Sequence, residues 1–332
     1  MKNRQIYHNS RIFLIGLLLS GIFSGCIRDS LSDCPTGVPI RVMVAVDAAR
    51  PEGGIGEDAC ENVMLYVFDD RGILLESIPT EVGRTEYLNY SGTRKFYAVA
   101  VANLNGSVSL SDLVPGQTNL SEGTMSLLAD VLEGEGSDFH TVPDDLFFGN
   151  LEIPNNPSAE VTELPVKRIV AGVVIRVKGM RESLNQPNAP CEDFHVVLGG
   201  LYNSVDFYGT PSYRKATRRV TEPVKHKFTG DFHHCDGADY FEVPVQTDPD
   251  TKTDFTRVLS TDEGSPVSVG LYYRGNMITE LPISTDRDGE PLNIRNRVLN
   301  VITIDLTGRI TVKIEQTAWG SRVEIEKEYG GK

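Results

Sequence analysis

The sequence lacks the local motifs by which many enzymes are recognised. It has no G-x-S-x-G nucleophile elbow, no phosphate-binding loop, no H-E-x-x-H zinc helix and no dinucleotide fingerprint on a strand–helix turn. Paired carboxylates for glycoside hydrolysis are defined by their separation in space, so a secreted hydrolase with an unrecognised site is kept as an alternative. The sequence therefore favours a protein that is not an enzyme and that uses no cofactor.

Basic residues are few. The chain has 32 Lys and Arg against 46 Asp and Glu, which gives a formal net charge of −14. Residues 1–25 contribute three of the basic residues and none of the acidic ones, so their removal would take the charge to −14 − 3 = −17. A chain this acidic repels a phosphate backbone, which argues against nucleic acid as a partner. The 40% of apolar residues are still enough for a sizeable core.

The apolar run Ile12–Phe23 is too short to span a bilayer as a helix, which takes about 20 residues. A basic segment precedes this run and small residues follow it, so we predict a signal peptide over residues 1–25. Cys26 comes next, and the arrangement resembles a bacterial lipobox with Phe23 in the place of the usual Leu. We expect Cys26 to be the first mature residue, anchored to a membrane by acyl chains such as palmitate. An ordinary signal peptide with a chance cysteine is the alternative.

Cysteine is scarce beyond Cys26. The four others are Cys34, Cys60, Cys191 and Cys235. An exported protein can form disulfides, and four cysteines allow three sets of pairs. We favour a Cys191–Cys235 disulfide because both lie in the second half. Nearby acidic and histidine residues make a metal site the alternative, but they lack the spacing of known zinc sites, so we expect no metal.

Alternating apolar residues predict β-strands throughout the first half. In Pro39–Asp47, every second residue from Ile40 is apolar, as in a half-buried strand. Asp69–Gly72 separates two apolar runs and predicts a hairpin. TEYLNY and KFYAVAVANLNG are expected to form another pair, in which Phe96–Val101 is a central strand because it is apolar on both faces. LFFGNLEIP predicts a further strand.

One segment has helical spacing instead. Met125, Leu128, Ala129 and Leu132 would share one face of a helix. Ser121 is a suitable N-cap and Gly134 a suitable end. We therefore predict the only clear helix of the first half between residues 119 and 133.

A second series of strands follows the Pro- and Asn-rich turn at 154–160, which is a candidate hinge. The series opens with ELPVKRIVAGVVIRVKGM, the longest strand signal of the chain. Many short alternating segments with turns between them favour β-sandwiches. We expect an all-β protein with a tether at residues 26–37, an N-terminal sandwich at 38–160 and a C-terminal sandwich at 161–332.

Several segments together resemble the FimB/Mfa2 family of fimbrial anchor proteins of Bacteroidetes. Cys26 is followed within about ten residues by an Asp-Cys-Pro, as at the mature start of that family. Further similar segments occur in the family's order and span most of the mature chain: NVMLYVFDDRG, KFYAVAVANLNG, LFFGN, VKRIVAGVVIRVKG, YNSVDFYG and a late Trp319. Cys60 departs from the pattern.

The resemblance implies two tandem transthyretin-like β-sandwiches and an outer-membrane lipoprotein of type V fimbriae that is exposed on the cell surface. The helix expected from residue spacing would be a short insertion in the first sandwich. It also implies other fimbrial subunits as partners. In such fimbriae a shaft subunit loses its first strand to proteolysis after an Arg, and a neighbour's strand fills the groove. An anchor that keeps its lipid must keep its first strand, here Pro39–Asp47, and would terminate the fibre.

Two further hypotheses concern contacts with other molecules. Val323, Ile325 and Tyr329 lie on one face of an extended tail, which predicts a donor strand for a neighbouring subunit. The alternative is that this tail is the last strand of the second sandwich. As another function, a surface adhesin that binds glycan or host protein would use a pocket lined by Tyr202, Phe207, Tyr208, Tyr272 and Tyr273.

Overall fold

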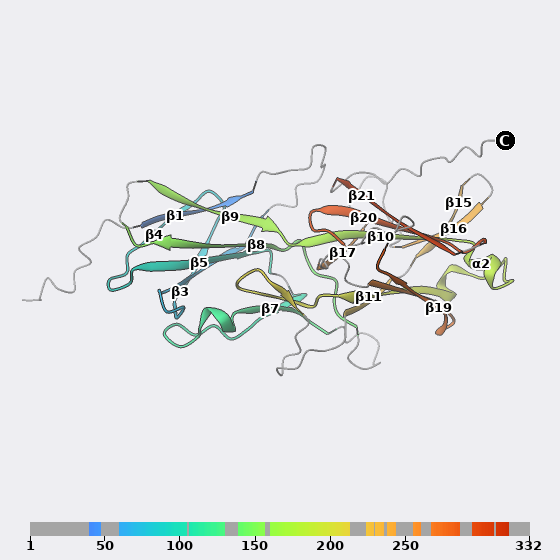
Figure 1. The fold of residues 1–332 in the computed structure, drawn as a ribbon, viewed down its shortest axis with the longest axis horizontal. Coiled ribbons are helices and arrows are strands. Elements are labelled where there is room, and N and C mark those ends of the chain that lie inside the picture. Colours follow the sequence, from blue (N-terminus) through green and yellow to red (C-terminus); the bar gives the residue numbers. More distant parts are fainter. Residues whose placement is uncertain are drawn as a thin grey trace, which may run out of the picture.

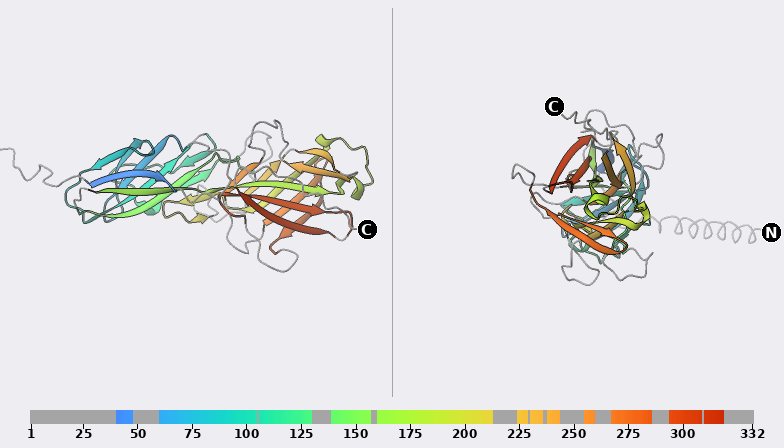
Figure 2. Two further views of the ribbon diagram at one scale, coloured as in Figure 1. Left: turned by 90° about the horizontal axis from the view of Figure 1, so that it is seen from above. Right: turned by 90° about the vertical axis from the view of Figure 1, so that its right-hand side faces the viewer.

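The computed structural model describes residues 40–47, 60–104, 106–129, 139–156, 160–212, 224–228, 230–235, 238–243, 255–259, 267–285, 294–308 and 310–318. These residues form a mostly β protein whose two halves lie end to end along its long axis (Figures 1 and 2). No helix within these ranges is long and apolar enough to cross a membrane. The prediction of an all-β fold is confirmed, whereas the transthyretin-like tandem arrangement stays a prediction.

The first half is built on a seven-stranded sheet in the order β3-β2-β5-β8-β9-β1-β4. Its strands are β1 (Ile40–Val46), β2 (Val63–Phe68), β3 (Leu74–Thr80), β4 (Thr85–Leu88), β5 (Lys95–Ala102), β8 (Phe147–Pro154) and β9 (Val161–Arg168). The strands at the two ends of the sheet, β3 and β4, follow each other in the chain. Thr80 Oγ1, at the end of β3, donates a 2.6 Å hydrogen bond to the Glu86 carboxylate in β4. The sheet therefore curls around one apolar cluster, to which β1, β2, β5, β8 and β9 all contribute.

A small sheet covers the other face of β2 and β5. Its order is β13-β12-β7-β6. The strands are β6 (Val108–Leu110), β7 (Thr124–Leu127), β12 (Ser204–Asp206) and β13 (Pro211–Ser212), and a 3-10 turn, η1 (Leu120–Glu122), precedes β7. Two of these strands come from the second half of the chain, so this sheet joins the two halves.

Two further sheets form the second half. One has the order β15-β16-β10-β20-β21, with β17 also paired to β10, and the other has the order β14-β11-β18-β19. The strands are β10 (Val170–Lys178), β11 (Phe194–Leu201), β14 (Val224–Phe228), β15 (Asp231–Cys235), β16 (Ala238–Val243), β17 (Thr256–Leu259), β18 (Val267–Tyr273), β19 (Asn276–Ile283), β20 (Val298–Asp305) and β21 (Thr311–Ala318). Short helical turns occur at α2 (Met180–Ser183) and η2 (Cys191–Asp193). One cluster of buried residues runs from these sheets into the small sheet of the first half.

Three sequence-based expectations about the elements are wrong. The segment expected to be a helix at 119–133 contains η1 and then strand β7, and Asn119 rather than Ser121 is the N-cap. The single turn ends because the chain becomes extended at Gly123 and Thr124–Leu127 pairs with β6 and β12. Strand β4 pairs with β1 instead of β5.

The third difference concerns the long strand signal after the candidate hinge, which is two strands. β9 is hydrogen-bonded to β8 and β1 in the first sheet, whereas β10 lies in the second half. The change of sheet occurs at Ile169. The division at residues 160 and 161 stays a prediction, and β9 lies on the N-terminal side of the sheet change.

Candidate functional site

The most informative site in the described residues is the slot that β1 occupies in the first sheet. Strand β1 pairs in parallel with β9 on one side and antiparallel with β4 on the other. Ile40, Val42 and Val44 face inward and are at most 5% exposed, while the residues between them are partly exposed. This period of two is the pattern that the sequence predicted for a half-buried strand. Both hydrogen-bonding edges of β1 are therefore in use.

The slot has an apolar floor. Ile40, Val42 and Val44 pack in one cluster whose other members include Leu88, Phe96, Ile153, Leu164 and Val166. Burial of three such side chains stabilises the strand's position by about 5–9 kcal/mol before the entropy cost of ordering the strand. A sheet that lacked β1 would expose this floor and the facing edges of β9 and β4.

Polar contacts fix the end of β1. The backbone N–H of Asp47 donates to Val166 O at 2.9 Å, and Gly83 N–H donates to Val44 O at 2.9 Å. The Asp47 carboxylate lies 3.4 Å from Lys167 Nζ and 3.5 Å from Arg297 Nη2. Arg297 precedes β20 and has a φ of +64°, in the left-handed region that few residues other than glycine adopt. The second half of the chain thus contacts the end of the first strand.

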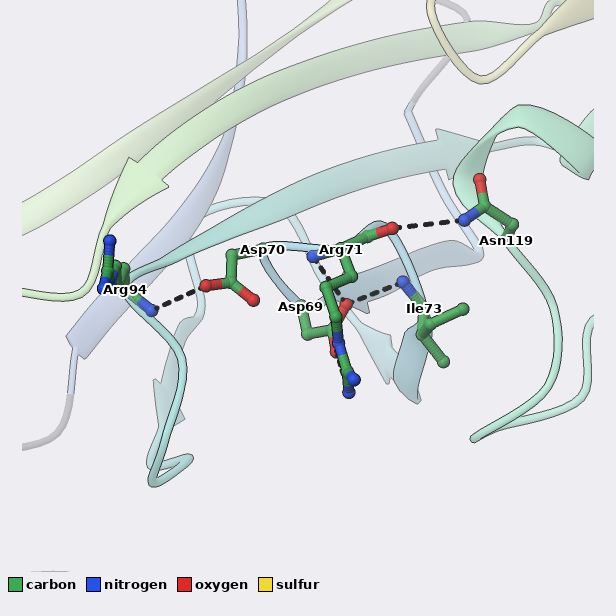
Figure 3. Close-up of polar contacts among 6 residues, drawn as sticks. All are labelled: Asp69, Asp70, Arg71, Ile73, Arg94 and Asn119. Atoms are coloured by element: carbon green, nitrogen blue, oxygen red, sulfur yellow. Dashed lines mark hydrogen bonds and ion pairs between the residues drawn. The ribbon is translucent and has the colours of Figure 1, made fainter.

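The β2–β3 turn lies at the opposite end of the sheet, where β1 begins. Figure 3 shows Asp69 at the centre of this turn. Its carboxylate is nearly fully buried and accepts hydrogen bonds from the backbone of Arg71 at 2.9 Å and of Ile73 at 2.8 Å, and from the Arg71 guanidinium. Asn119 Nδ2 donates to Arg71 O at 3.2 Å and joins the turn to η1. The turn predicted at Asp69–Gly72 is confirmed.

A hollow of about 810 Å³ opens at the end of the sheet where β1 ends. It is lined by Cys60, Glu61, Asn62, Val63, Met64, Pro79, Thr80, Glu81, Val82 and Arg84. Burial raises the pKa of the Cys60 thiol to about 11, helped by the charge of Asp145 and opposed by Arg168. Arg168 makes two hydrogen bonds to Asp145, at 2.5 and 2.8 Å. The thiol is therefore protonated at neutral pH and is a poor nucleophile.

Of the two cysteines in the expected disulfide, only Cys191 has a described side chain. Cys191 is a free thiol whose Sγ donates to Asp231 Oδ1 at 2.8 Å. Asp231 begins β15 and Cys235 ends it, a separation of about 13 Å along a strand. A disulfide needs Cα atoms within about 7 Å of each other. This geometry disfavours the Cys191–Cys235 pair, but the Cys235 side chain lies outside the described residues and the pair stays a prediction.

The other expected site residues are only partly covered. Cys26 and the tail residues Val323, Ile325 and Tyr329 lie outside the described ranges. Within those ranges no three His, Cys, Asp or Glu side chains gather as a metal site.

The aromatic residues of the adhesin alternative do not share one pocket. Phe207 packs against Tyr66 and Phe68 in the first half. Tyr273 instead packs against Phe194, and Tyr272 stacks on His195 with ring centroids 4.7 Å apart.

Comparisons with known proteins agree on one family. A family model described as "Fimbrillin-A associated anchor proteins Mfa1 and Mfa2" matches residues 31–324. The major fimbrium anchoring subunit FimB of Porphyromonas gingivalis is 26% identical over 317 residues, which cover 91% of this chain and 93% of that protein.

Solved structures share the fold at low sequence identity. The fimbrial anchor protein Mfa2 of Porphyromonas gingivalis matches with a TM-score of 0.52 and 13% identity, over 85% of this chain and 97% of that one. A putative adhesin of Bacteroides thetaiotaomicron matches with a TM-score of 0.55 and 12% identity, over 84% and 97%. These matches support the predicted β-sandwich class.

Proposed function

Because the chain belongs to the family of fimbrillin-A associated anchor proteins Mfa1 and Mfa2, we propose that it holds a fimbria to the outer membrane and terminates the fibre there. The family consists of structural fimbrial proteins rather than enzymes, and a relative is named for anchoring the major fimbrium. The lipid on Cys26 is the membrane attachment in this proposal. Several acyl chains give stable attachment, whereas one gives only marginal binding.

The position of β1 is the observation that carries the proposal. A shaft subunit offers its neighbour an empty groove, and the groove of this chain is filled by its own first strand, paired on both sides. The same strand connects the fold to the segment that bears Cys26. A chain that keeps its lipid therefore also keeps β1 in the groove. No neighbouring subunit can insert a strand there, so the fibre cannot grow at this groove.

The direction of the chain fits this arrangement. Strand β1 begins at the end of the sheet that is far from the second half. In the sequence, the segment that bears Cys26 precedes this strand. The tether of residues 26–37 covers at most about 40 Å when extended. In this proposal the first half faces the membrane and the second half projects outward, where other fimbrial subunits bind.

The tail is the proposed contact with the next subunit. Val323, Ile325 and Tyr329 would be the apolar side chains of a donor strand. The last described strand, β21, ends at Ala318, which is paired with Val298 in β20. A donor strand would therefore start near the middle of the molecule. Deletion of residues 323–332 is expected to leave a folded, membrane-bound protein that no longer holds fimbriae.

The decisive experiment separates cell-bound from released fibres. In the natural host, Cys26→Ala is expected to place both the protein and its fibres in the culture medium. Cys191→Ala removes another cysteine and should leave the fibres on the cells. If fibres remain attached to cells that make only the Cys26→Ala protein, the proposed anchoring role is wrong.

A further inference from the structure

The hairpin formed by β12 and β13 extends from the second half into the first. Strand β12 pairs with β7, with Ser204 opposite Ser126 and Asp206 opposite Thr124. Two more backbone hydrogen bonds lie beside this ladder, from Leu127 N to Asn203 O at 2.8 Å and from Phe207 N to Gly123 O at 3.0 Å. The hairpin is thus held in the first half by continuous backbone pairing.

Phe207 fixes the hairpin in place. Its ring is fully buried and lies 5.4 Å from the ring of Tyr66 and 6.1 Å from that of Phe68. Asn150 Nδ2 donates to Phe207 O at 3.1 Å. A Cβ atom on Gly123 would lie 2.3 Å from the Phe207 ring, so only glycine leaves room for it. The first half therefore contains a shaped seat for this side chain.

The turn of the hairpin is fixed by its own contacts. Asp206 Oδ1 accepts hydrogen bonds from the backbone N–H groups of Tyr208 at 3.0 Å and Thr210 at 2.8 Å. Gly209 has a φ of +81°, and a Cβ there would lie 3.1 Å from the Phe148 ring. Tyr208 points outward and is 55% exposed. The hairpin consequently keeps its shape and presents Phe207 to the seat with little entropy cost.

We propose that the hairpin Asn203–Ser212 has a mechanical function: it locks the two halves into one unit that resists a pull along the long axis. The covalent link between the first sheet and the second half runs through Ile169, between β9 and β10. A single extended link of this kind would let the halves swing and separate. Beside the Asp47–Arg297 contact, the hairpin supplies an attachment through paired backbone, and a pull on the second half loads the β12–β7 ladder and the buried Phe207 together.

This inference rests on the proposed function in one respect only, namely that a force pulls on the chain. Its test needs neither fimbriae nor membranes. The lipidated full chain in detergent is compared with Phe207→Ala and with Tyr208→Ala by scanning calorimetry. The natural chain and Tyr208→Ala are expected to unfold in one transition. Phe207→Ala is expected to split this transition in two, with the lower one shifted down by about 10 °C.

Single-molecule pulling between the ends of the chain gives an independent measurement. One unfolding event is expected for the natural chain and two for Phe207→Ala. If Phe207→Ala does not fold, Phe207→Leu replaces it, with the expectation of a smaller split in the same direction. The inference is overturned if the natural chain unfolds in two transitions, or if the Phe207 variants unfold in one transition as Tyr208→Ala does.

Discussion

The Asp47 carboxylate and the Arg297 guanidinium meet across the middle of the molecule, with Oδ2 and Nη2 3.5 Å apart, although 250 positions separate the two residues. Asp47 directly follows the first strand, and Arg297 precedes β20 in the second half. Together with Lys167, Arg297 surrounds the end of β1 with positive charge. The second half of the chain therefore helps to hold the first strand in its slot.

Asp47→Asn is expected to speed hydrogen exchange at the end of β1. The side chains of Asp47 and Arg297 are 25% and 27% exposed, so the ion pair should stabilise the end of β1 by at most about 1 kcal/mol, which the variant loses. It should shrink as salt rises to about 0.5 M because the pair is partly screened. Exchange mass spectrometry measures the effect. Glu315→Gln breaks the exposed Lys313–Glu315 pair and serves as the control. Equal exchange in both variants would contradict the expected role of Asp47.

Val44→Asp should unfold or strongly destabilise the first half. Val44 is 1% exposed in the slot, so the carboxylate would be buried without a partner, at a cost above about 3 kcal/mol. Val46→Asp is the matched control, since Val46 lies on the same strand but is 41% exposed. Urea denaturation should show a lower free energy of unfolding for Val44→Asp. For Val46→Asp the free energy of unfolding should change by no more than about 0.5 kcal/mol. Similar losses for both would mean that β1 is not buried as described.

Cys60 should react slowly and should make stability depend on alkaline pH. Its pKa rises from 9.0 to about 11 on folding, mainly through burial. Alkylation at pH 8 should therefore be about 100-fold slower in the folded than in the unfolded chain. The folded state releases the thiol proton at a higher pH than the unfolded state does. The contribution of Cys60 to the free energy of unfolding is therefore complete below pH 9 and is lost as the pH rises toward 11. Cys60→Ala should remove that part of the pH dependence, which denaturation at several pH values can measure.

The bond after Arg50 should resist arginine-specific proteases. Arg50 follows β1 in the sequence and precedes Pro51, which lacks the backbone N–H and restricts the residue before it. Pro51→Ala should allow cleavage there, seen as a fragment whose first residue is the substituted one. Cleaved protein should then exchange its first strand for an added peptide with the β1 sequence. Cleavage of the natural chain after Arg50 would contradict the proposed retention of β1.

The sequence was sufficient to predict β1 from its alternation, the β2–β3 hairpin from two apolar runs on either side of a turn, and the central strand β5 from a run that is apolar on both faces. Each of these signals is local, because the burial of a strand's side chains shows directly in the residue order. The residue order does not show in the same way which other strand a given strand pairs with. TEYLNY precedes KFYAVAVANLNG, yet β4 pairs with β1, whose side chains lie much earlier in the chain.

The helix prediction failed for a different reason. Met125 and Leu128 fit a helical face, but Met125 and Leu127 also alternate as strand residues, and both are buried. Short apolar runs satisfy both periods. The strand form prevails because β7 finds partners on both sides, and one of them, β12, comes from the second half. A pattern read over a few residues contains no information about that distant partner.

Much of the candidate site was likewise hidden from the sequence. The retained strand was predicted from its alternation and from the family resemblance, whereas its contact with Arg297 was not. Arg297 has a left-handed backbone conformation without the glycine or asparagine that would have signalled it. Phe207 gave no local signal of its role either, because its seat at Gly123 belongs to another element.

The parallel pairing of β1 with β9 has a consequence for the order of biogenesis. Arg41 lies opposite Val161, so the strand made first cannot complete its ladder until the chain beyond residue 160 has followed. Pairings this distant in sequence form slowly. If Cys26 is lipidated as proposed, the N-terminal segment would be accessible to the acylating enzymes during that interval, while its strand is still free of the sheet. Lipid attachment would thus precede closure of the slot, and the finished fold would seal a segment already fixed to the bilayer.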